Sequence, residues 1–425
     1  MCRTAGPGHY RLVIPSSAAG RNPEDLSPLN SCMKRVVVIG GGPAGAFAAE
    51  RLARAGVSTI LIDERLAWEK PCGGGLTYKA YNRYPFLLEN NFPKKLVRET
   101  RLAAPGAGWA RLSLNRPLLV YSRLDLNRLL LERAERAGAS LEQTRVLEVT
   151  PSDAGWQVQT KHGLLEADFL IVAAGARNTL RNVGTQWGPS DIMCALGYYL
   201  PDQQDHIDIQ FVPLLEGYIW VFPRCGHLSA GICGKGLPAP ALRQRLEAYL
   251  ERRGLDWRHG QFYSHVLPSL EPGTWVRNRV AGPGWMAVGD AGGLVDPVTG
   301  EGLYYAIRSA ELASQALLED QHPPGEKPRL YRHLLLKDFV ADLAFGAGLA
   351  KRLFLGKFLF GTVPQRMVQF LRRSPRFHAL MQDLFAGTQS YQDLKERLLK
   401  NFHGTMFETV MNFLLTRVLP GENPV

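Results

Sequence analysis

A glycine-rich turn between a strand-like run and a helix-like run constrains the fold of this chain more than any other feature. The turn follows Ile39 and reads Gly40-Gly41-Gly42-Pro43-Ala44-Gly45. This is the G-x-G-x-x-G spacing of a dinucleotide-binding βαβ unit. Gly40 permits the tight turn, Gly42 lets a pyrophosphate approach the backbone, and Gly45 lets the helix pack closely on the strand.

A second strand-like run, 59–62, ends at Asp63, about 20 residues after the glycines, where a carboxylate receives ribose hydroxyls. The phosphates are expected at the helix N-terminus, whose free N–H groups and dipole favour anions. We therefore predict cofactor contacts from this turn, Ala44 included, and from Asp63. The turn alone does not distinguish NAD from FAD.

Length and charge limit the organisation and the partners. A chain of 425 residues favours two connected domains with an appendage. Its net charge is +11, and residues 327–425 hold 15 Lys and Arg against 7 Asp and Glu. Such a basic region suits anionic lipid, nucleic acid or an acidic partner. Because no nucleic-acid motif is visible, lipid is the preferred partner.

The six cysteines include no C-x-x-C pair, which favours a reducing compartment and no zinc or other metal. Residues 1–32 lack hydrophobic periodicity and an apolar signal core. We expect them to form a disordered extension, or translation to begin at Met33. The chain is therefore predicted to be cytoplasmic, with peripheral membrane contact through its basic C-terminal region.

The remaining pattern mixes helices and strands. Residues 65–115 are expected to be irregular and 123–139 helical. Residues 192–275 read mostly as strands, with one helix at 240–253. Helices are expected at 300–318 and through 327–419, broken at Pro364 and Pro375. Short strands are expected at 140–149, 156–160 and 169–173.

The most apolar C-terminal segment is 339–363. Charges at Asp342, Lys351 and Arg352 interrupt it, so it is too polar for a transmembrane helix. Its interleaved basic and aromatic residues suit an amphipathic helix on a bilayer. They suit equally a helix that packs on the protein's own core.

A second glycine motif, Gly289-Asp290-Ala291-Gly292-Gly293, follows another apolar strand and precedes the segment 296–302. It resembles the second fingerprint of the group-A-hydroxylase-like flavoproteins, which implies FAD. The resemblance places Asp290 on the ribityl chain and the helix start at Gly300 and Gly302 near the pyrimidine edge of the flavin. Helix N–H groups there would stabilise the anionic reduced ring.

Two further segments resemble the geranylgeranyl reductases within this group. They are the loop Lys70-Pro71-Cys72-Gly73-Gly74-Gly75 and the run Tyr218-Ile219-Trp220-Val221-Phe222-Pro223, which matches a Y-x-W-x-F-P signature. The resemblance covers about residues 33–330. It implies an α+β and α/β fold: an FAD-binding Rossmann-like three-layer domain, an antiparallel-sheet substrate domain and a helical C-terminal region. We expect the FAD domain at 33–185 and 276–326, the substrate domain at 186–275 with part of 65–120, and the helices at 327–425.

Both segments have two interpretations. Strand alternation places Tyr218, Trp220 and Phe222 on one face, as sheet core or as a pocket wall, and the resemblance favours the pocket. Cys72 is either a small buried apolar residue or a thiol near the flavin that gates substrate or supplies a proton. We name Cys72, Tyr218 and Trp220 as candidate catalytic residues.

The chain departs from the family pattern at two places. Ala174 stands before Gly175 where the family usually has Asp, which puts direct NAD(P)H use in doubt and leaves NAD(P)H or ferredoxin as the electron donor. The segment from Arg123 keeps the family's arginine, a cofactor contact, but has Leu126 and Asn127 where Phe and Asp are usual.

The resemblance implies reduction of carbon–carbon double bonds in a long isoprenoid by hydride from reduced FAD, with protonation of the alkene. No proton donor emerges from the sequence. The alternatives are a flavin monooxygenase or halogenase, a non-redox carotenoid-type cyclase, and a lipid-binding flavoprotein. Candidate substrates are geranylgeranyl chlorophyll precursors, ether lipids, menaquinone and polyprenyl phosphates, between which the fold does not decide.

Overall fold

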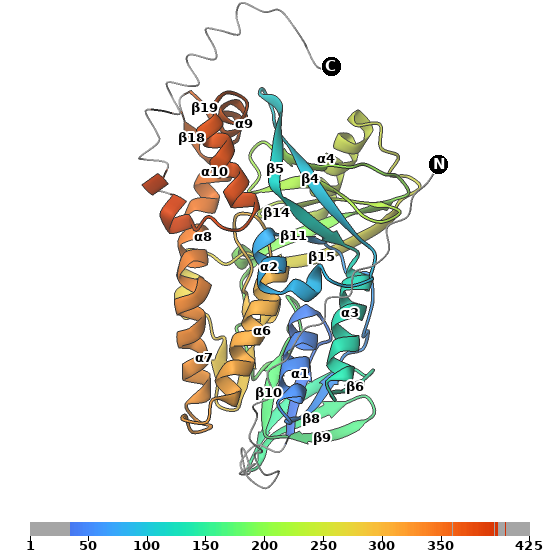
Figure 1. Cartoon of the computed structure of the whole chain (residues 1–425), viewed down its shortest axis with the longest axis vertical. Helices are drawn as coiled ribbons and strands as arrows, with labels where there is room; N and C mark the ends of the chain where they lie inside the picture. The colour runs from blue at the N-terminus through green and yellow to red at the C-terminus, as the bar shows by residue number, and fades with distance from the viewer. Residues whose placement is uncertain (1–34, 359, 395, 398–403, 405–425) are drawn as a thin grey trace, which may run out of the picture.

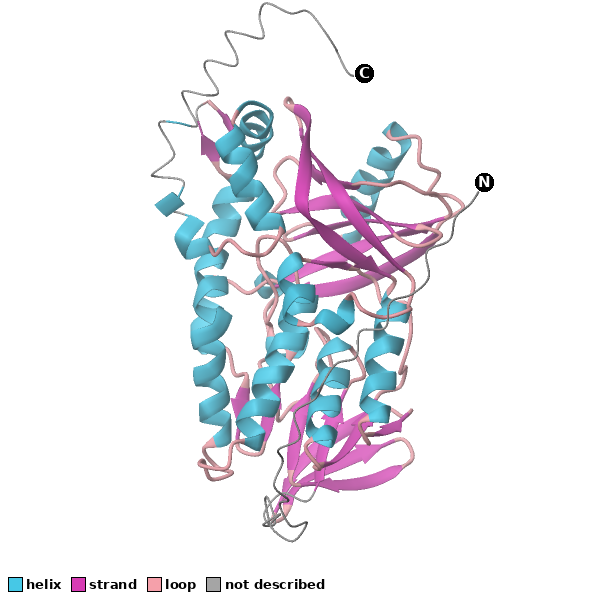
Figure 2. Cartoon of the chain, in the orientation of Figure 1, coloured by secondary structure: helices cyan, strands magenta, loops and turns pink. Residues whose placement is uncertain are grey.

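The computed structural model describes residues 35–358, 360–394, 396–397 and 404. The predicted extension 1–32 lies outside these residues, as does the end of the predicted helical region up to 419. Figure 1 shows an elongated molecule, with one group of strands near α1 and another near α4. Figure 2 shows helices stacked along one side of both groups.

The first sheet is the predicted nucleotide-binding sheet. Its six strands are ordered β16-β17-β10-β1-β2-β6 and are parallel, except that β16 is antiparallel to β17. Parallel order around β1 is what a βαβ unit produces. The strands are β1 (Arg35–Ile39), β2 (Ser58–Ile62), β6 (Ser140–Glu142), β10 (Phe169–Val172), β16 (Ala281–Gly282) and β17 (Trp285–Ala287).

Alternation along β1 defines three layers. Val36 and Val38 pack in the core shared with the helices, whereas Val37 and Ile39 pack against a small three-stranded sheet. The predicted three-layer fold is therefore confirmed. The helices are α1 (Pro43–Arg54), α3 (Arg123–Arg136) and α6 (Leu303–Leu318), and the small sheet is β7 (Val146–Ser152), β8 (Gly155–Thr160) and β9 (Gly163–Ala167).

The single strand predicted at 140–149 is wrong. Glu142 is the last residue of β6 to pair with β2, and the chain then turns, with the Thr144 amide 3.1 Å from the Glu142 carbonyl. The continuation from Val146 pairs with β8 in a different sheet. This one stretch of sequence thus contributes strands to two layers.

The second sheet has eight strands in the order β15-β11-β14-β13-β12-β4-β5-β3. Its strands are antiparallel, as predicted, except for the parallel pair β12 and β4. The strands are β3 (Gly75–Leu76), β4 (Lys94–Ala104), β5 (Gly108–Tyr121), β11 (Ile192–Leu200), β12 (Ile207–Phe211), β13 (Gly217–Pro223), β14 (Leu228–Gly234) and β15 (Gln261–Pro268).

The prediction that 65–115 is irregular is also wrong. The long hairpin of β4 and β5 occupies much of it, and Leu112 and Leu114 are buried while Arg111 and Ser113 are exposed. The turn residues Pro105 and Gly106 lie between the strands. Pro and Gly indicate a turn only at their own positions, whereas the residues on either side alternate between buried and exposed as they do in strands.

The two faces of β13 have different neighbours. Ile219 and Val221 pack in one apolar cluster with helix α4 (Ala239–Arg252), close to the predicted helix at 240–253. Trp220 belongs to a separate cluster on the opposite face, with Tyr218 and Phe222 packed against it. The aromatic face is therefore turned away from α4 and is available to line a cavity.

The C-terminal region forms a helical column beside α6 (Figure 1). Pro364 and Pro375 each lie in the first turn of a helix, where a backbone N–H has no partner within the helix and its absence costs little. The predicted breaks at these two prolines are therefore confirmed. A short hairpin interrupts the predicted helix. The elements are α7 (Lys327–Leu335), the π-helical turn Leu336–Val340, α8 (Ala341–Leu355), β18 (Lys357–Phe358), β19 (Gly361–Thr362), α9 (Val363–Arg373) and α10 (Pro375–Phe385).

One face of helix α8 shows which of the two interpretations of 339–363 applies to it. Leu343, Ala347, Ala350 and Phe354 are buried in the main core, so this face packs on the protein itself. Within the described residues, no helix is long and apolar enough to cross a membrane.

Candidate cofactor and substrate site

The glycine turn after β1 divides into packing positions and an open position. A Cβ on Gly40 would lie 2.3 Å from the Ala173 carbonyl oxygen, and one on Gly45 would lie 1.8 Å from the Gly40 carbonyl oxygen. A Cβ on Gly42, at the N-cap of α1, would meet nothing within 4 Å. Gly42 therefore leaves the space at the helix N-terminus open to a ligand.

Asp63 lies at the end of β2, at the edge of a cavity of about 320 Å³. Its carboxylate accepts hydrogen bonds from the Gly41 amide at 2.6 Å and the Arg65 amide at 2.8 Å. Burial raises the pKa of Asp63 although both amides act against the shift. The two amides hold the carboxylate in a fixed orientation at the edge of this cavity.

Arg123 provides a test of whether a diphosphate fits this space. Its side chain is only 4% exposed and borders both cavities, and its guanidinium donates one long hydrogen bond of 3.4 Å to the side-chain Oδ1 of Asn127. Its Nε has no hydrogen-bond partner among the described residues. A buried cation with unused donors is costly, and a diphosphate beside Gly42 would satisfy it. The residues present thus fit FAD.

The second glycine motif contributes a carboxylate to the larger cavity. Asp290 forms an ion pair of 3.0 Å with Lys70, and both residues line a cavity of about 660 Å³. Burial alone would raise the pKa of Asp290, but the charge and hydrogen bond of Lys70, together with the charges of Arg123 and His265, hold that pKa below its usual value. Gly175, Gly300 and Gly302 border the same cavity.

Most of the predicted cofactor residues border one of the two cavities. Gly45 and Gly289 do not; the amide of Gly289 is bonded to Ser309 Oγ at 2.9 Å, and a Cβ on it would lie 3.1 Å from that of Ala44. Those two glycines have packing roles. The residues that border a cavity are Gly40, Gly42, Ala44, Asp63, Arg123, Gly175, Asp290, Gly300 and Gly302.

The aromatic face of β13 lines the 660 Å³ cavity. Tyr218, Trp220 and Phe222 all border it, which favours the pocket interpretation over sheet core. The Tyr218 hydroxyl donates to the Thr299 carbonyl. The Phe222 ring packs against Gly75 so closely that a Cβ on that glycine would lie 2.8 Å from the ring. Further from the glycines the wall is apolar and includes Ile209, Phe211, Phe354, Met381, Leu384 and Phe385.

The loop that carries Cys72 is anchored from two sides. The Cys72 carbonyl accepts hydrogen bonds from Ser229 Oγ at 2.9 Å and from the guanidinium of Arg224, which also pairs with Glu69. Glu69 accepts from the Arg123 amide at 3.0 Å, at the start of α3. The half-buried Cys72 is thereby held at the cavity wall, with its Sγ 3.3 Å from the Gly74 amide.

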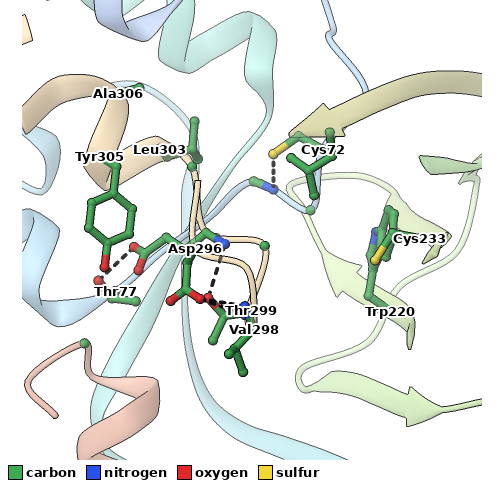
Figure 3. A pocket seen from close by; sticks show the side chains of 18 of the residues that line it. Cys72, Thr77, Trp220, Cys233, Asp296, Val298, Thr299, Leu303, Tyr305 and Ala306 are labelled. Atoms are coloured by element: carbon green, nitrogen blue, oxygen red, sulfur yellow. Dashed lines mark hydrogen bonds between the residues drawn. The ribbon is translucent and has the colours of Figure 1, made fainter. Parts of the chain in front are cut away.

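Sequence reasoning missed several polar residues of this site. Arg224 follows the aromatic signature directly, but its partner Glu69 lies 155 positions away, so spacing could not identify the pair. The segment 296–302 was singled out as a flavin-edge turn, but its carboxyls were given no role. In Figure 3, Asp296, Thr299 and Tyr305 lie on one side of the cavity and Cys72, Trp220 and Cys233 on the other.

The chain is similar in sequence to known flavoprotein reductases. Residues 34–188 match the model of the pyridine nucleotide-disulphide oxidoreductase family. A digeranylgeranylglycerophospholipid reductase of Thermoplasma volcanium is 31% identical over 320 residues, covering 67% of this chain and 78% of the relative. A menaquinone reductase of Mycobacterium tuberculosis is 29% identical over 367 residues, covering 78% and 87%.

Solved structures show the same fold. A geranylgeranyl bacteriochlorophyll reductase-like protein of Thermoplasma acidophilum superposes with a TM-score of 0.70 at 23% identity. The alignment covers 87% of this chain and 99% of that one. A flavin-dependent brominase also matches, with a TM-score of 0.61 at 15% identity. The fold is thus shared by proteins with different chemistry, and the site must carry the functional argument.

Proposed function

The chain belongs to the geranylgeranyl reductase family of FAD-dependent oxidoreductases, and from this premise we propose that it saturates carbon–carbon double bonds of a long isoprenoid. The observation that carries the proposal is the continuity of the 660 Å³ cavity, which extends from Gly42 and Asp290 to Phe354 and Met381. One end suits a dinucleotide and the other an apolar chain. Bound reduced FAD would supply hydride to an alkene held between them.

The residues divide into two groups by role. We propose that Gly42, Arg123 and Asp63 hold the FAD diphosphate and ribose, and that Asp290 contacts the ribityl chain. Tyr218 and Trp220 would orient the isoprenoid, and Cys72, on its anchored loop, would control access to the reacting carbons. The apolar wall excludes water from the charge that develops on the alkene.

The test is an anaerobic single-turnover experiment on the FAD-loaded protein. The flavin is reduced with NADPH, NADH or reduced ferredoxin, and the donor that bleaches the visible flavin absorbance is identified. Isoprenoids with diphosphate, glycerophospholipid, quinone and chlorophyll-type head groups are then added. Recovery of flavin absorbance with a product two mass units heavier per double bond supports the proposal; failure with all four classes contradicts it.

The same experiment separates the alternatives. A product of unchanged mass would indicate a cyclase, and oxygen-dependent hydroxylation or halogenation would indicate a monooxygenase or halogenase. A flavin that no donor reduces would indicate a binding protein. The Y-x-W-x-F-P run from Tyr218 to Pro223 differs from the W-x-W-x-I-P signature of halogenases, which favours the reductase.

We further propose that the tip of the β18–β19 hairpin contacts an anionic membrane. Phe360 is fully exposed, and Leu355 is 41% exposed nearby in the chain. Lys351, Arg352 and Lys357 are also exposed there. An exposed aromatic with neighbouring basic residues matches the interfacial region of an anionic bilayer. Such contact would bring the apolar cavity close to a lipid substrate.

Phe360→Ser should weaken binding to vesicles of anionic phospholipid about tenfold, because burying a Phe side chain contributes about 1.5–3 kcal/mol. Co-sedimentation across a lipid titration measures the effect. Leu164→Ser is a matched control, since Leu164 is 53% exposed but lies on β9, far from this hairpin in Figure 1. Equal loss in both variants, or no loss in either, would contradict the contact.

A further inference from the structure

Two carboxyl groups from one tight loop border the large cavity. Asp296 and Glu301 both line it, and the loop between them is closed by backbone hydrogen bonds. The Asp296 amide donates to the Glu301 carbonyl at 3.0 Å, and the Gly300 amide donates to the Asp296 carbonyl at 2.9 Å. Two neighbouring carboxyls in a poorly solvated wall do not both ionise readily, so one of them retains a proton.

Asp296 has the hydrogen-bond environment of the ionised member. The Tyr391 hydroxyl lies 2.7 Å from both of its oxygens, and the amides of Val298 and Thr299 donate to it at 2.8 and 3.1 Å. All three partners are donors, and an ionised carboxylate is an acceptor only. Burial raises the pKa of Asp296 as well, but these donors act against the rise, so we assign the negative charge of the pair to Asp296.

Glu301 has the environment of the protonated member. Its side chain accepts a hydrogen bond from Thr77 Oγ1 at 3.1 Å, and the backbone amide of Thr77 also donates to it. Burial, and then the charge of Asp296, raise the pKa of Glu301 to about 7. It is half-buried because its side chain borders the cavity, so a proton on it is accessible from that space.

The other titratable groups around Glu301 do not compete for this role. Lys79 acts against the rise in the pKa of Glu301, but its ammonium lies over the ring of Tyr304 at 4.6 Å. Burial raises the pKa of Tyr304 to about 12 and the pKa values of Tyr305 and Tyr391 well above their usual value. Unlike these three tyrosines, Glu301 can exchange a proton near neutral pH.

We propose that Glu301 is the proton donor of the reduction, a role that rests on the proposed function. The Glu301 carboxyl gives its proton to one carbon of the double bond, and the π electron pair forms that C–H bond. The other carbon receives the hydride that reduced FAD supplies. Glu301 is left as a carboxylate and regains a proton from water before the next turnover, so that each cycle adds one H⁺ and one H⁻ to the alkene.

The test compares the FAD-loaded wild type with Glu301→Gln and Glu301→Asp. The rate of flavin reoxidation by the isoprenoid is measured from pH 5 to 9. The wild-type rate should fall as pH rises through about 7, where the donor loses its proton. Glu301→Gln should be at least about 100-fold slower with a flat profile and unchanged FAD content, and Glu301→Asp should recover part of the rate.

A second readout does not depend on turnover. A pKa raised in the folded state stabilises the protein at low pH, and this stabilisation is lost as pH rises from about 4.5 to 7. The melting temperature of Glu301→Gln, relative to wild type, should therefore rise over that window. Glu50→Gln is the control, because Glu50 is buried and paired with Arg133 at 2.5 Å but does not border the cavity.

The outcomes separate the two proposals. If wild type reduces an isoprenoid and Glu301→Gln keeps its rate and pH profile, Glu301 is not the donor. If Cys72→Ala flattens the profile and Glu301→Gln does not, the thiol is the donor. If wild type reduces no isoprenoid, the proposed function and this role both fall, and the melting comparison then reports only whether Glu301 holds a proton.

Discussion

Gly42→Val will leave the chain folded but unable to retain FAD. The backbone of Gly42 has φ −69° and ψ −179°, which any residue adopts, and a Cβ there meets no protein atom within 4 Å. The cost to the apoprotein is therefore about 1 kcal/mol or less, that of a poorer N-cap. The valine side chain instead fills the space through which a diphosphate reaches the α1 amides. We expect FAD affinity to fall at least about 100-fold, or about 2.8 kcal/mol.

The measurement pairs calorimetric titration of FAD with thermal unfolding of the apoprotein. Gly45→Val is the matched comparison, because its Cβ would lie 1.8 Å from a backbone oxygen. That clash requires the helix to move, and we expect a loss of about 3 kcal/mol or more in stability. If Gly42→Val bound FAD as wild type does, the proposed position of the diphosphate would be wrong.

The sequence predicted best what depends on local pattern. The turn between Ile39 and Ala46, the strand before Asp63 and the breaks at Pro364 and Pro375 each follow from a few adjacent residues, and the structure contains them all. Strand alternation also placed Tyr218, Trp220 and Phe222 on one face. The sequence of that strand could not show which of its two faces borders a cavity, because this depends on α4, which covers the opposite face.

What the sequence could not supply are contacts between distant segments. Asp296 is held by Tyr391, 95 positions further on, and Glu301 by Thr77, 224 positions earlier. Neither pairing has a spacing that a pattern could detect. The protonation of Glu301 depends on the space enclosed when those segments meet, so a proton donor became visible only with the fold. The β4–β5 hairpin was missed for the opposite reason, since a Pro-Gly turn obscured the alternation around it.

Arg224→Met will destabilise the protein more than substitutions in exposed ion pairs do. Arg224 is fully buried, pairs with Glu69 and donates to the Cys72 carbonyl. Methionine retains much of the packing but leaves the Glu69 carboxylate without its cation. Removing one partner of a buried pair costs about 3–5 kcal/mol. Urea unfolding at pH 7 with saturating FAD measures the loss. Arg243→Met, which removes a partly exposed i,i+4 pair with Glu247, should cost about 1 kcal/mol or less.

Two further measurements connect this loss to the Glu69 charge. Burial opposes ionisation of Glu69, but Arg224 and the amides of Arg123 and Leu124 together lower its pKa, so their stabilisation is present above pH 4.5 and is lost as pH falls below it. The difference between wild type and Arg224→Met should therefore shrink at acidic pH. Adding Glu69→Gln should restore part of the stability, because it removes the uncompensated charge. If the double variant were as unstable as the sum of both single changes, Arg224 would act through packing under Cys72 and the charge pair would not be the cause.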